Sequence, residues 1–263
     1  MEMSLPNHCS LRTPSSPHHR RSRSRRARLR TRRSAPAPAA AAAAEEEEEA
    51  VEIRVCVNRT CARQGSRGVL AALAGLAPAG VAVAACGCLG RCGAGPNLAV
   101  LPRGALVGHC GTPARAAQLL ADLCGPRFDP RANLEALALR KKGEDELERG
   151  SPAEAETLLS QAVDLNPSGG LHFMYRSRSA ARLAIGNIAG ALADATEASK
   201  IAPDYPQAYL SQGDAFLAME EWDAAEKAYS TALHLDPLLR RSKSFKARVA
   251  KLQEKLTTVS ASS

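Results

Sequence analysis

The sequence predicts an α/β domain followed by an all-α solenoid of helical repeats. Seven of the eight cysteines lie between Cys56 and Cys124, among segments that read as strands and helices. After residue 136, small residues recur every 34 positions, the mark of a repeat architecture. A length of 263 residues suits two domains of ordinary size.

The positive charge of the chain is confined to its first segment. Residues 1–44 hold ten Arg and one acid, Glu2, for a local charge of +9, and the other 219 residues carry 25 basic and 26 acidic side chains. The folded part therefore has no excess of basic groups to bind phosphates, and we expect it not to bind nucleic acid.

Residues 1–44 are rich in Ser, Arg, Pro and Ala and show no hydrophobic period, so we expect them to be disordered. Their composition is typical of a transit peptide, which predicts a chloroplast (stromal) protein, with the mitochondrion as an alternative. The basic run from Arg20 to Arg26 also fits a nuclear localisation signal. Residues 45–50 would form an acidic spacer.

Two strands and one helix are expected to open the folded part. Residues 51–57 alternate as a strand, residues 66–77 suit a helix capped by Ser66, and residues 81–85 suit a parallel neighbouring strand. The uncharged stretch 68–90 is long enough to span a bilayer, but it is dominated by Ala and Gly and interrupted by proline. We therefore expect no transmembrane segment.

Two pairs of cysteines follow the two parallel strands. Cys56 and Cys61 come after the first strand, and Cys88 and Cys92 come after the second. Because parallel strands end at the same edge of a sheet, the four thiolates should converge there. A hairpin over residues 98–109 and a helix over residues 113–124 complete the order strand, helix, strand, strand, strand, helix.

This order and the run Cys-x3-Cys-Gly-x-Gly-Pro-Asn at residues 88–97 resemble the thioredoxin-like [2Fe-2S] ferredoxins over about residues 51–125. The resemblance implies a thioredoxin-like domain whose cluster ligands are Cys56, Cys61, Cys88 and Cys92. It also implies one-electron transfer. The glycines of the loop would let backbone N–H groups approach the sulfurs.

Other interpretations of the cysteines stay open. Tetrahedral zinc accepts similar spacings. Structural disulfides would suit a secreted chain, and a reactive thiol pair such as Cys86 with Cys88 is a further alternative. Cys110 and Cys124 are expected to be small buried hydrophobic residues.

The second half aligns as three copies, at residues 136–169, 172–205 and 206–239, after a linker at residues 126–135. Each copy has 34 residues, which we number as places 1 to 34 from its first residue. Small residues at places 8, 20 and 27 should let the two helices of a copy pack closely. Place 15 should turn the chain, and proline at place 32 should end the second helix. These five places hold Gly143, Gly150, Ala155, Ala162 and Pro167, then Ser179, Gly186, Ala191, Ala198 and Pro203, then Gly213, Glu220, Ala225, Ala232 and Pro237.

The pattern resembles the tetratricopeptide repeat (TPR), which implies a concave groove for a protein or peptide partner and repeats that stack only on one another. In the family's chaperone carboxylate clamp, five groove positions hold Lys, Asn, Asn, Lys and Arg. The corresponding residues here are Arg140, Glu144, Ser177, Gln207 and Ser211. Only one of them is basic and one is an acid, so we do not expect this chain to bind a chaperone tail. Arg176 and Asp214 join them as groove candidates.

A capping helix is expected at residues 240–257, with Phe245, Val249, Leu252 and Leu256 on its apolar face, before a disordered tail at 258–263. Its seven Lys and Arg residues should form a solvated face, and contact with an acidic partner or a phosphate backbone is the alternative.

The expected function is a plastid adaptor or assembly factor that carries a [2Fe-2S] cluster for electron transfer or redox sensing and holds a protein partner in the groove. The alternative is a TPR scaffold or co-chaperone whose cysteine domain binds zinc or no metal. No acid, base or nucleophile constellation is apparent near the cysteines, so we expect no enzyme.

Overall fold

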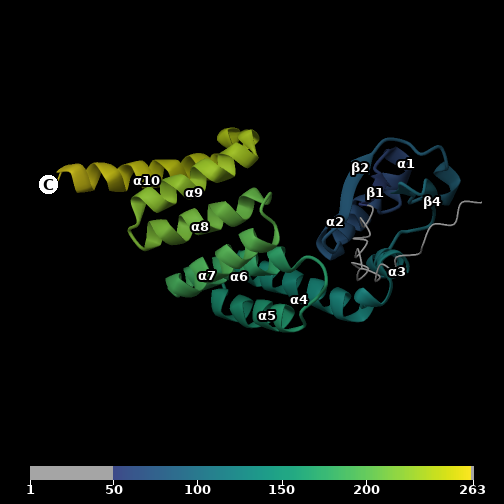
Figure 1. The fold of residues 1–263 in the computed structure, drawn as a ribbon, viewed down its shortest axis with the longest axis horizontal. Helices are drawn as coiled ribbons and strands as arrows, with labels where there is room; N and C mark the ends of the chain where they lie inside the picture. The colour runs from purple at the N-terminus through teal and green to yellow at the C-terminus, as the bar shows by residue number, and fades with distance from the viewer. Residues whose placement is uncertain (1–49, 262–263) are drawn as a thin grey trace, which may run out of the picture. The chain divides into compact units, whose positions relative to one another are not determined.

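A computed structural model describes residues 50–261 (Figure 1). The expected transit segment, nearly all of the acidic spacer and residues 262–263 lie outside the described residues. In chain order the elements are β1 (Val51–Cys56), α1 (Arg59–Arg63), α2 (Ser66–Leu76), β2 (Val81–Cys86), η1 (Cys92–Ala94), β3 (Leu98–Leu101), β4 (Ala105–Val107), α3 (Pro113–Cys124), η2 (Gly125–Arg127), α4 (Pro130–Arg149), α5 (Pro152–Asp164), α6 (Leu171–Ala184), α7 (Ile188–Ile201), α8 (Pro206–Ala218), α9 (Trp222–Leu235), η3 (Pro237–Arg241) and α10 (Lys243–Ala261).

The N-terminal domain is a four-stranded sheet in the order β2-β1-β3-β4. β1 runs parallel to β2 and antiparallel to β3, and β3 pairs with β4 as a hairpin. Ile53, Val55 and Leu98 point to one face, where Leu73 of α2 and Leu120 of α3 complete the core. The predicted order of strands and helices is confirmed, with the short α1 added directly after β1.

The predicted cap of α2 is wrong. Gly65 occupies the cap position with a left-handed backbone (φ 93°), and no side chain caps the helix. Ser66 is instead the first helical residue, fully buried, and its hydroxyl has no hydrogen-bond partner among the described residues.

The expected linker at 126–135 is mostly ordered in secondary structure. α4 begins at Pro130, capped by the Asp129 side chain, which accepts hydrogen bonds from the N–H groups of Arg131 and Ala132. Phe128, 3% exposed, packs into the core of the sheet domain. The repeat pattern does not predict this helix start, because the pattern begins at residue 136 and α4 begins six residues earlier, at Pro130.

Helices α4 to α9 form three successive pairs, side by side in chain order (Figure 1). Close packing explains the small residues at place 8 of the repeats. A methyl group added at Gly143 would lie 2.7 Å from the Leu159 side chain, and one at Gly213 would lie 2.3 Å from the Tyr229 ring. The two helices of these pairs can therefore approach only because a side chain is missing.

Place 15 turns the chain in all three repeats. Gly150 and Gly186 have left-handed backbones, with φ of 83° and 84°. Glu220 adopts the same region with φ of 63°, although a side chain is strained there. The turn is thus imposed by the packing of the two helices that it joins.

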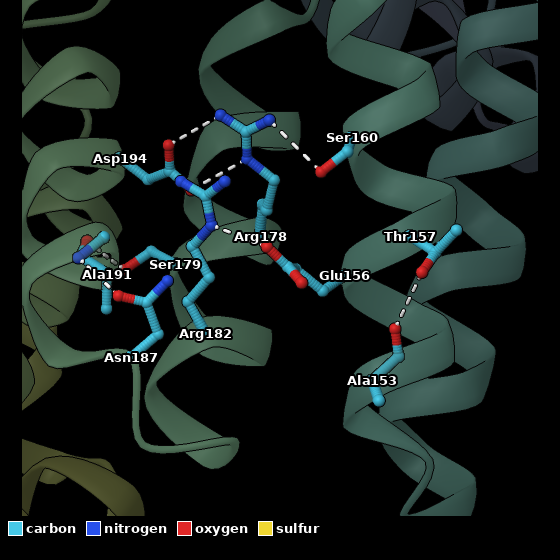
Figure 2. A network of polar contacts seen from close by, with 11 residues as sticks. Ala153, Glu156, Thr157, Ser160, Arg178, Ser179, Arg182, Asn187, Ala191 and Asp194 are labelled. Atoms are coloured by element: carbon cyan, nitrogen blue, oxygen red, sulfur yellow. Dashed lines mark hydrogen bonds and ion pairs between the residues drawn. The ribbon is translucent and has the colours of Figure 1, made fainter.

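A buried ion-pair network ties the second pair of helices to the first (Figure 2). The Arg178 guanidinium donates two hydrogen bonds of 2.8 Å to the Asp194 carboxylate, which is 4% exposed. Arg182 bridges Asp194 and Glu156, at 3.0 Å from each. The side chains of α5, α6 and α7 are thereby fixed relative to one another.

The capping helix extends further than expected, since α10 runs to Ala261 through the predicted tail. Phe245 and Leu252 are buried as predicted, while Leu256 is 37% exposed. Arg248 departs from the expected solvated face, because its Nε lies 2.8 Å from an oxygen of Asp214 on α8. The helix is therefore fastened to the third repeat by charge as well as by packing.

The cysteine domain packs directly on the first repeat, so the repeats do not stack only on one another. Pro78 forms an isolated antiparallel bridge with Gly169 in the loop between α5 and α6. A methyl group at Gly169 would lie 1.9 Å from the Leu76 carbonyl oxygen. Leu137 of α4 packs into the core of the sheet domain. We call this contact the junction.

Within residues 50–261, none of the helices has the length and apolar character needed to cross a membrane.

Candidate functional site

Both cysteine-bearing loops leave the same end of the sheet. Cys56 ends β1 and Cys61 lies on α1, which Asn58 caps through its side chain. Cys88 and Cys92 lie on the loop that follows β2. The parallel register of β1 and β2, with Cys56 opposite Cys86, brings the two loops side by side.

The thiols of these loops lie as two pairs. The Sγ atoms of Cys88 and Cys92 are 3.8 Å apart, and both residues are exposed. Cys56 and Cys61 are 1% and 2% exposed. Over the described part of the chain, no three Cys, His, Asp or Glu side chains lie close enough together to hold one ion.

Groups of each cysteine loop shift the pKa of a thiol in the other loop. Burial raises the pKa of the Cys56 thiol, but hydrogen bonds from the backbone of Asn58 and Leu89 and from Cys61 outweigh it, so the pKa is lowered. Leu89 belongs to the second loop. The pKa of Cys92 is raised, chiefly by its hydrogen bond with Cys88 and further by the charges of Cys61 and Cys56.

Asn97 also holds the loops together, a role that the sequence pattern did not reveal. The side chain is 2% exposed, and its amide donates to the Cys61 Sγ at 3.6 Å and to the Arg91 carbonyl oxygen at 2.7 Å. It therefore joins the first cysteine loop to the second. Gly95, two residues before Asn97, is closely packed, since a methyl group there would press on the Gln64 side chain and lie 3.1 Å from the Cys61 Sγ.

The remaining thiols are set apart from the two pairs in different ways. Cys86 ends β2 and is half-buried, and burial together with the nearby Cys56 raises the pKa of its thiol. Cys110 is 1% exposed within the core, and burial raises the pKa of its thiol. Cys124 packs against the same core.

The spacing of the exposed thiols fits the needs of a metal ion. Two thiolates bound to one tetrahedral metal at about 2.3 Å lie about 3.8 Å apart, which is the separation of Cys88 and Cys92. The four thiols of the two loops are the groups that would hold a metal, and the amide of Asn97 and the N–H of Gly90 donate to the sulfurs of Cys61 and Cys88. Sulfur donors that accept such hydrogen bonds suit an iron–sulfur cluster.

The clamp positions of the first two repeats contact one another. Arg140 forms an ion pair with Glu144 at 3.7 Å, and Ser177 donates to the Glu144 carboxylate at 2.8 Å. The Arg140 side chain is 12% exposed, and its Nε has no hydrogen-bond partner among the described residues. Arg140, the basic residue at the first clamp position, is therefore paired with an acid of its own helix.

An aromatic cluster lies beside these residues and was not predicted. The rings of His172 and Phe173 are 3.9 Å apart, and each is 5.2 Å from the Tyr205 ring. The Arg140 guanidinium lies 5.1 Å from the Phe173 ring centre. Burial raises the pKa of Tyr205, while nearby Arg176 opposes that shift. Phe173 and Tyr205 are two of only nine Phe, Trp and Tyr residues in the chain.

The third repeat contributes Gln207, Ser211 and Asp214 from α8, all half-buried. Asp214 accepts a hydrogen bond from the Tyr229 hydroxyl at 2.8 Å and is bound by Arg248. The carboxylate of Asp214, a groove candidate from the sequence, is therefore already paired with Arg248.

Comparison with known proteins identifies the second half of the chain. A family model described as "Tetratricopeptide repeat" matches residues 140–206, 181–240 and 210–253. The chain is 36% identical over 77 residues to the "Protein STIP1 homolog" of Dictyostelium discoideum, covering 29% of this chain and 13% of that protein. It is 35% identical over 98 residues to the "Hsp70-Hsp90 organizing protein" of Triticum aestivum, covering 37% and 16%. The chain spans only these small fractions of the relatives' lengths.

Solved structures of repeat domains are also similar. The first TPR domain of human RPAP3 aligns with a TM-score of 0.44 at 24% identity, covering 49% of this chain and 98% of that one. The first TPR of Spaghetti (RPAP3), solved with the HSP90 peptide SRMEEVD, gives 0.43 at 24% identity, covering 51% and 99%. The family model confirms that the repeats predicted from the sequence form a tetratricopeptide repeat domain.

Proposed function

We propose that the chain is a protein-binding adaptor of the co-chaperone type, which holds a partner on the face formed by α4, α6 and α8. The main support is that the second half is a tetratricopeptide domain related in sequence to Hsp70-Hsp90 organizing proteins. Such repeats bind peptides or helices in a groove and perform no chemistry themselves.

Charge reversal in the groove tests this proposal. Proteins captured by the full chain are compared with those captured by a variant carrying Arg176→Glu and Gln207→Glu. Partners of the groove should be lost from that variant and retained by Lys227→Glu, an exposed change on α9. Identical sets of captured proteins from all three chains would contradict the adaptor role.

The groove should not select an acidic chaperone tail. Four of the five clamp positions lack the required chemistry, and the remaining Arg140 is already paired with Glu144. Each missing charge-assisted hydrogen bond should weaken binding by roughly 1.5 to 3 kcal/mol. Titration with the peptide SRMEEVD, a ligand of the Spaghetti repeat, should show at most weak binding. Micromolar affinity that Arg140→Ala abolishes would refute this prediction.

A second role is proposed for the cysteine domain, namely binding of a [2Fe-2S] cluster, with zinc as the alternative. The specific support is the arrangement of the thiols as two pairs, because a binuclear cluster takes two thiolates on each iron. Cys56 and Cys61 would hold one iron and Cys88 and Cys92 the other. The bound cluster would supply one-electron transfer, while Asn97 would orient the Cys61 sulfur.

Metal analysis separates these alternatives. Protein purified without oxygen should contain iron and inorganic sulfide in equal amounts and show an electron paramagnetic resonance signal after reduction. Replacing Cys56, Cys61 or Cys92 by Ser should remove the iron, whereas Cys110→Ser or Cys124→Ser should retain it. In Cys88→Ser, Cys86 lies on the same loop as a substitute ligand, so that chain can retain a distorted centre. Zinc without iron would establish the alternative, and wild-type levels of iron in a Cys56→Ser, Cys61→Ser or Cys92→Ser chain would overturn the ligand set.

The proposed location is the chloroplast stroma, and it rests on the composition of residues 1–44. A fluorescent reporter fused after residue 44 should enter plastids. Accumulation of that reporter in mitochondria or the nucleus would assign the segment to one of the alternatives.

A further inference from the structure

The two cysteine pairs differ sharply in their access to solvent. Cys88 and Cys92 are exposed and their Sγ atoms are 3.8 Å apart, whereas Cys56 and Cys61 are buried. Oxidants dissolved in water reach the first pair without any opening of the fold. Oxidation of a thiol follows its thiolate character and its exposure. The pKa of Cys92 is raised and that of Cys56 is lowered, so the first pair is the more susceptible because of its exposure and not because of its acidity.

The loop that carries the exposed pair has room to contract. A methyl group at Gly87, Gly90 or Gly93 would meet no atom within 4 Å, and Gly90 has a left-handed backbone with φ of 77°. A disulfide needs its sulfurs about 2.05 Å apart. Closing the gap therefore requires movement of the segment around Gly87 and Gly90, which precedes the Arg91 held by Asn97, and leaves the core unchanged.

We propose that Cys88 and Cys92 form a reversible disulfide when the chain holds no metal. In the first step, the thiolate of one cysteine attacks a small-molecule disulfide such as glutathione disulfide and releases one glutathione thiolate. In the second, the other cysteine attacks the mixed disulfide and releases the second glutathione. Two protein S–H bonds are lost and one S–S bond forms, while the oxidant is reduced to two thiols that take up the two protons.

Cys86 is the competing partner for Cys92, and the sheet disfavours it. Cys86 is the last residue of β2, where its backbone is paired in register with Cys56 and its carbonyl accepts a hydrogen bond from the Val57 N–H at 3.0 Å. Cys88 lies two residues further on, beyond the hydrogen-bonded ladder. The free loop thus brings Cys88, and not Cys86, to Cys92.

The disulfide would control loading of the metal site. Cys88 and Cys92 are half of the proposed ligand set, and sulfurs joined in a disulfide are not thiolate ligands. This consequence rests on the proposed metal-binding role, but the disulfide itself does not. An oxidised chain should therefore take up metal only after a reductant has opened the bond.

The experiment uses the full chain, freed of metal by a chelator and equilibrated in glutathione buffers of increasing oxidised fraction. Free thiols are then blocked by alkylation before trypsin digestion. Cleavage after Arg91 separates Cys88 from Cys92, so the disulfide appears as a link between peptides 68–91 and 92–103. Oxidation should also lower the mass of the intact chain by about 2 Da, and dithiothreitol should reverse both changes.

Variants identify the sulfur that is joined to Cys92. Cys86→Ser should keep the linked peptides at the wild-type fraction, and Cys92→Ser should lower that fraction at least about tenfold. Circular dichroism confirms that each variant keeps its helices. Loss of the link in Cys86→Ser, a first disulfide between Cys56 and Cys61, or alkylation of all eight thiols in the most oxidising buffer would each overturn the inference. Uptake of iron or zinc added afterwards to the oxidised and to the dithiothreitol-treated chain tests the loading of the metal site separately, and its result leaves these outcomes unchanged.

Discussion

At the scale of single residues, Asn97 connects the two cysteine loops. Asn97→Ala removes the donor to Cys61 and leaves the Arg91 carbonyl oxygen without that partner. We expect the free energy of unfolding to fall by about 1 to 3 kcal/mol. We also expect Cys61 to react faster with an alkylating reagent, as measured by mass spectrometry.

Asn187→Ala provides the matched control for Asn97. Asn187 caps α7 by accepting a hydrogen bond from the Gly190 N–H, far along the chain from the cysteines. Its loss should cost about 1 kcal/mol without changing the reactivity of Cys61. Equal alkylation of Cys61 in the wild type and in Asn97→Ala would show that Asn97 does not shield this thiol.

His172 should make stability depend on pH. Burial lowers the pKa of its imidazole, the nearby Arg140 lowers it further, and Asp204 opposes them weakly. Below pH about 6.5, His172 therefore binds a proton in the unfolded chain but stays neutral in the folded chain until the pH reaches its lower pKa there. The free energy of unfolding should fall as pH drops from 6.5 toward the lower pKa of the folded state, and the loss is complete below that pKa.

Urea denaturation at pH 7.5 and pH 5 measures this effect. His172→Phe keeps an aromatic ring against Phe173 and Tyr205 but cannot bind a proton. Its stability should fall less between the two pH values than that of the wild type, since only the carboxylates shared by both chains then contribute. The same decrease in both chains would exclude His172 as the titrating group.

At the scale of secondary-structure elements, two helical glycines should respond oppositely to the same substitution. Gly213→Ala places a methyl group against the Tyr229 ring and should destabilise the chain by about 1 to 3 kcal/mol. Gly68→Ala in α2 meets no atom within 4 Å. It should stabilise the chain by about 0.5 to 1 kcal/mol, because alanine favours the helix.

Thermal denaturation of both variants checks these signs. A stabilising Gly213→Ala would mean that α8 and α9 are not in close contact at this place. A destabilising Gly68→Ala would mean that α2 is packed there by something outside the described residues.

The element scale also shows how far the sequence alone could lead. The strands and the repeat helices were predictable, because alternation and small residues at fixed places express packing within one element or between neighbours. Ser66 was misread as a cap because glycine at the preceding position leaves no local signal of where the helix starts. The contacts of Asn97 and the aromatic cluster around Tyr205 join residues far apart in the chain, which no local period records.

At the scale of the whole molecule, the junction should make the two domains unfold together. Gly169→Ala forces a methyl group onto the Leu76 carbonyl oxygen. Since backbone at this position cannot yield as a flexible side chain would, we expect a lower melting temperature and a second transition as the domains separate. Differential scanning calorimetry records both.

Gly87→Ala is the control for the junction, because a methyl group there meets no atom within 4 Å. It should leave one transition near the wild-type temperature. One cooperative transition in Gly169→Ala at the wild-type temperature would contradict coupling through the junction.

Helix α4 has a consequence for regulation, because it belongs to two cores at once. Arg140 and Glu144 of the proposed groove form an ion pair on it, and Leu137 packs among the residues of the sheet domain, where Arg140 also lies close to Gly75 of α2. A partner that stabilises α4 from the groove side also stabilises the domain that holds the cysteines. Such coupling is reciprocal. If a bound metal changes the affinity of the proposed groove for its partner by some factor, the bound partner changes the affinity of the cysteines for the metal by the same factor. The same holds for the equilibrium of a disulfide.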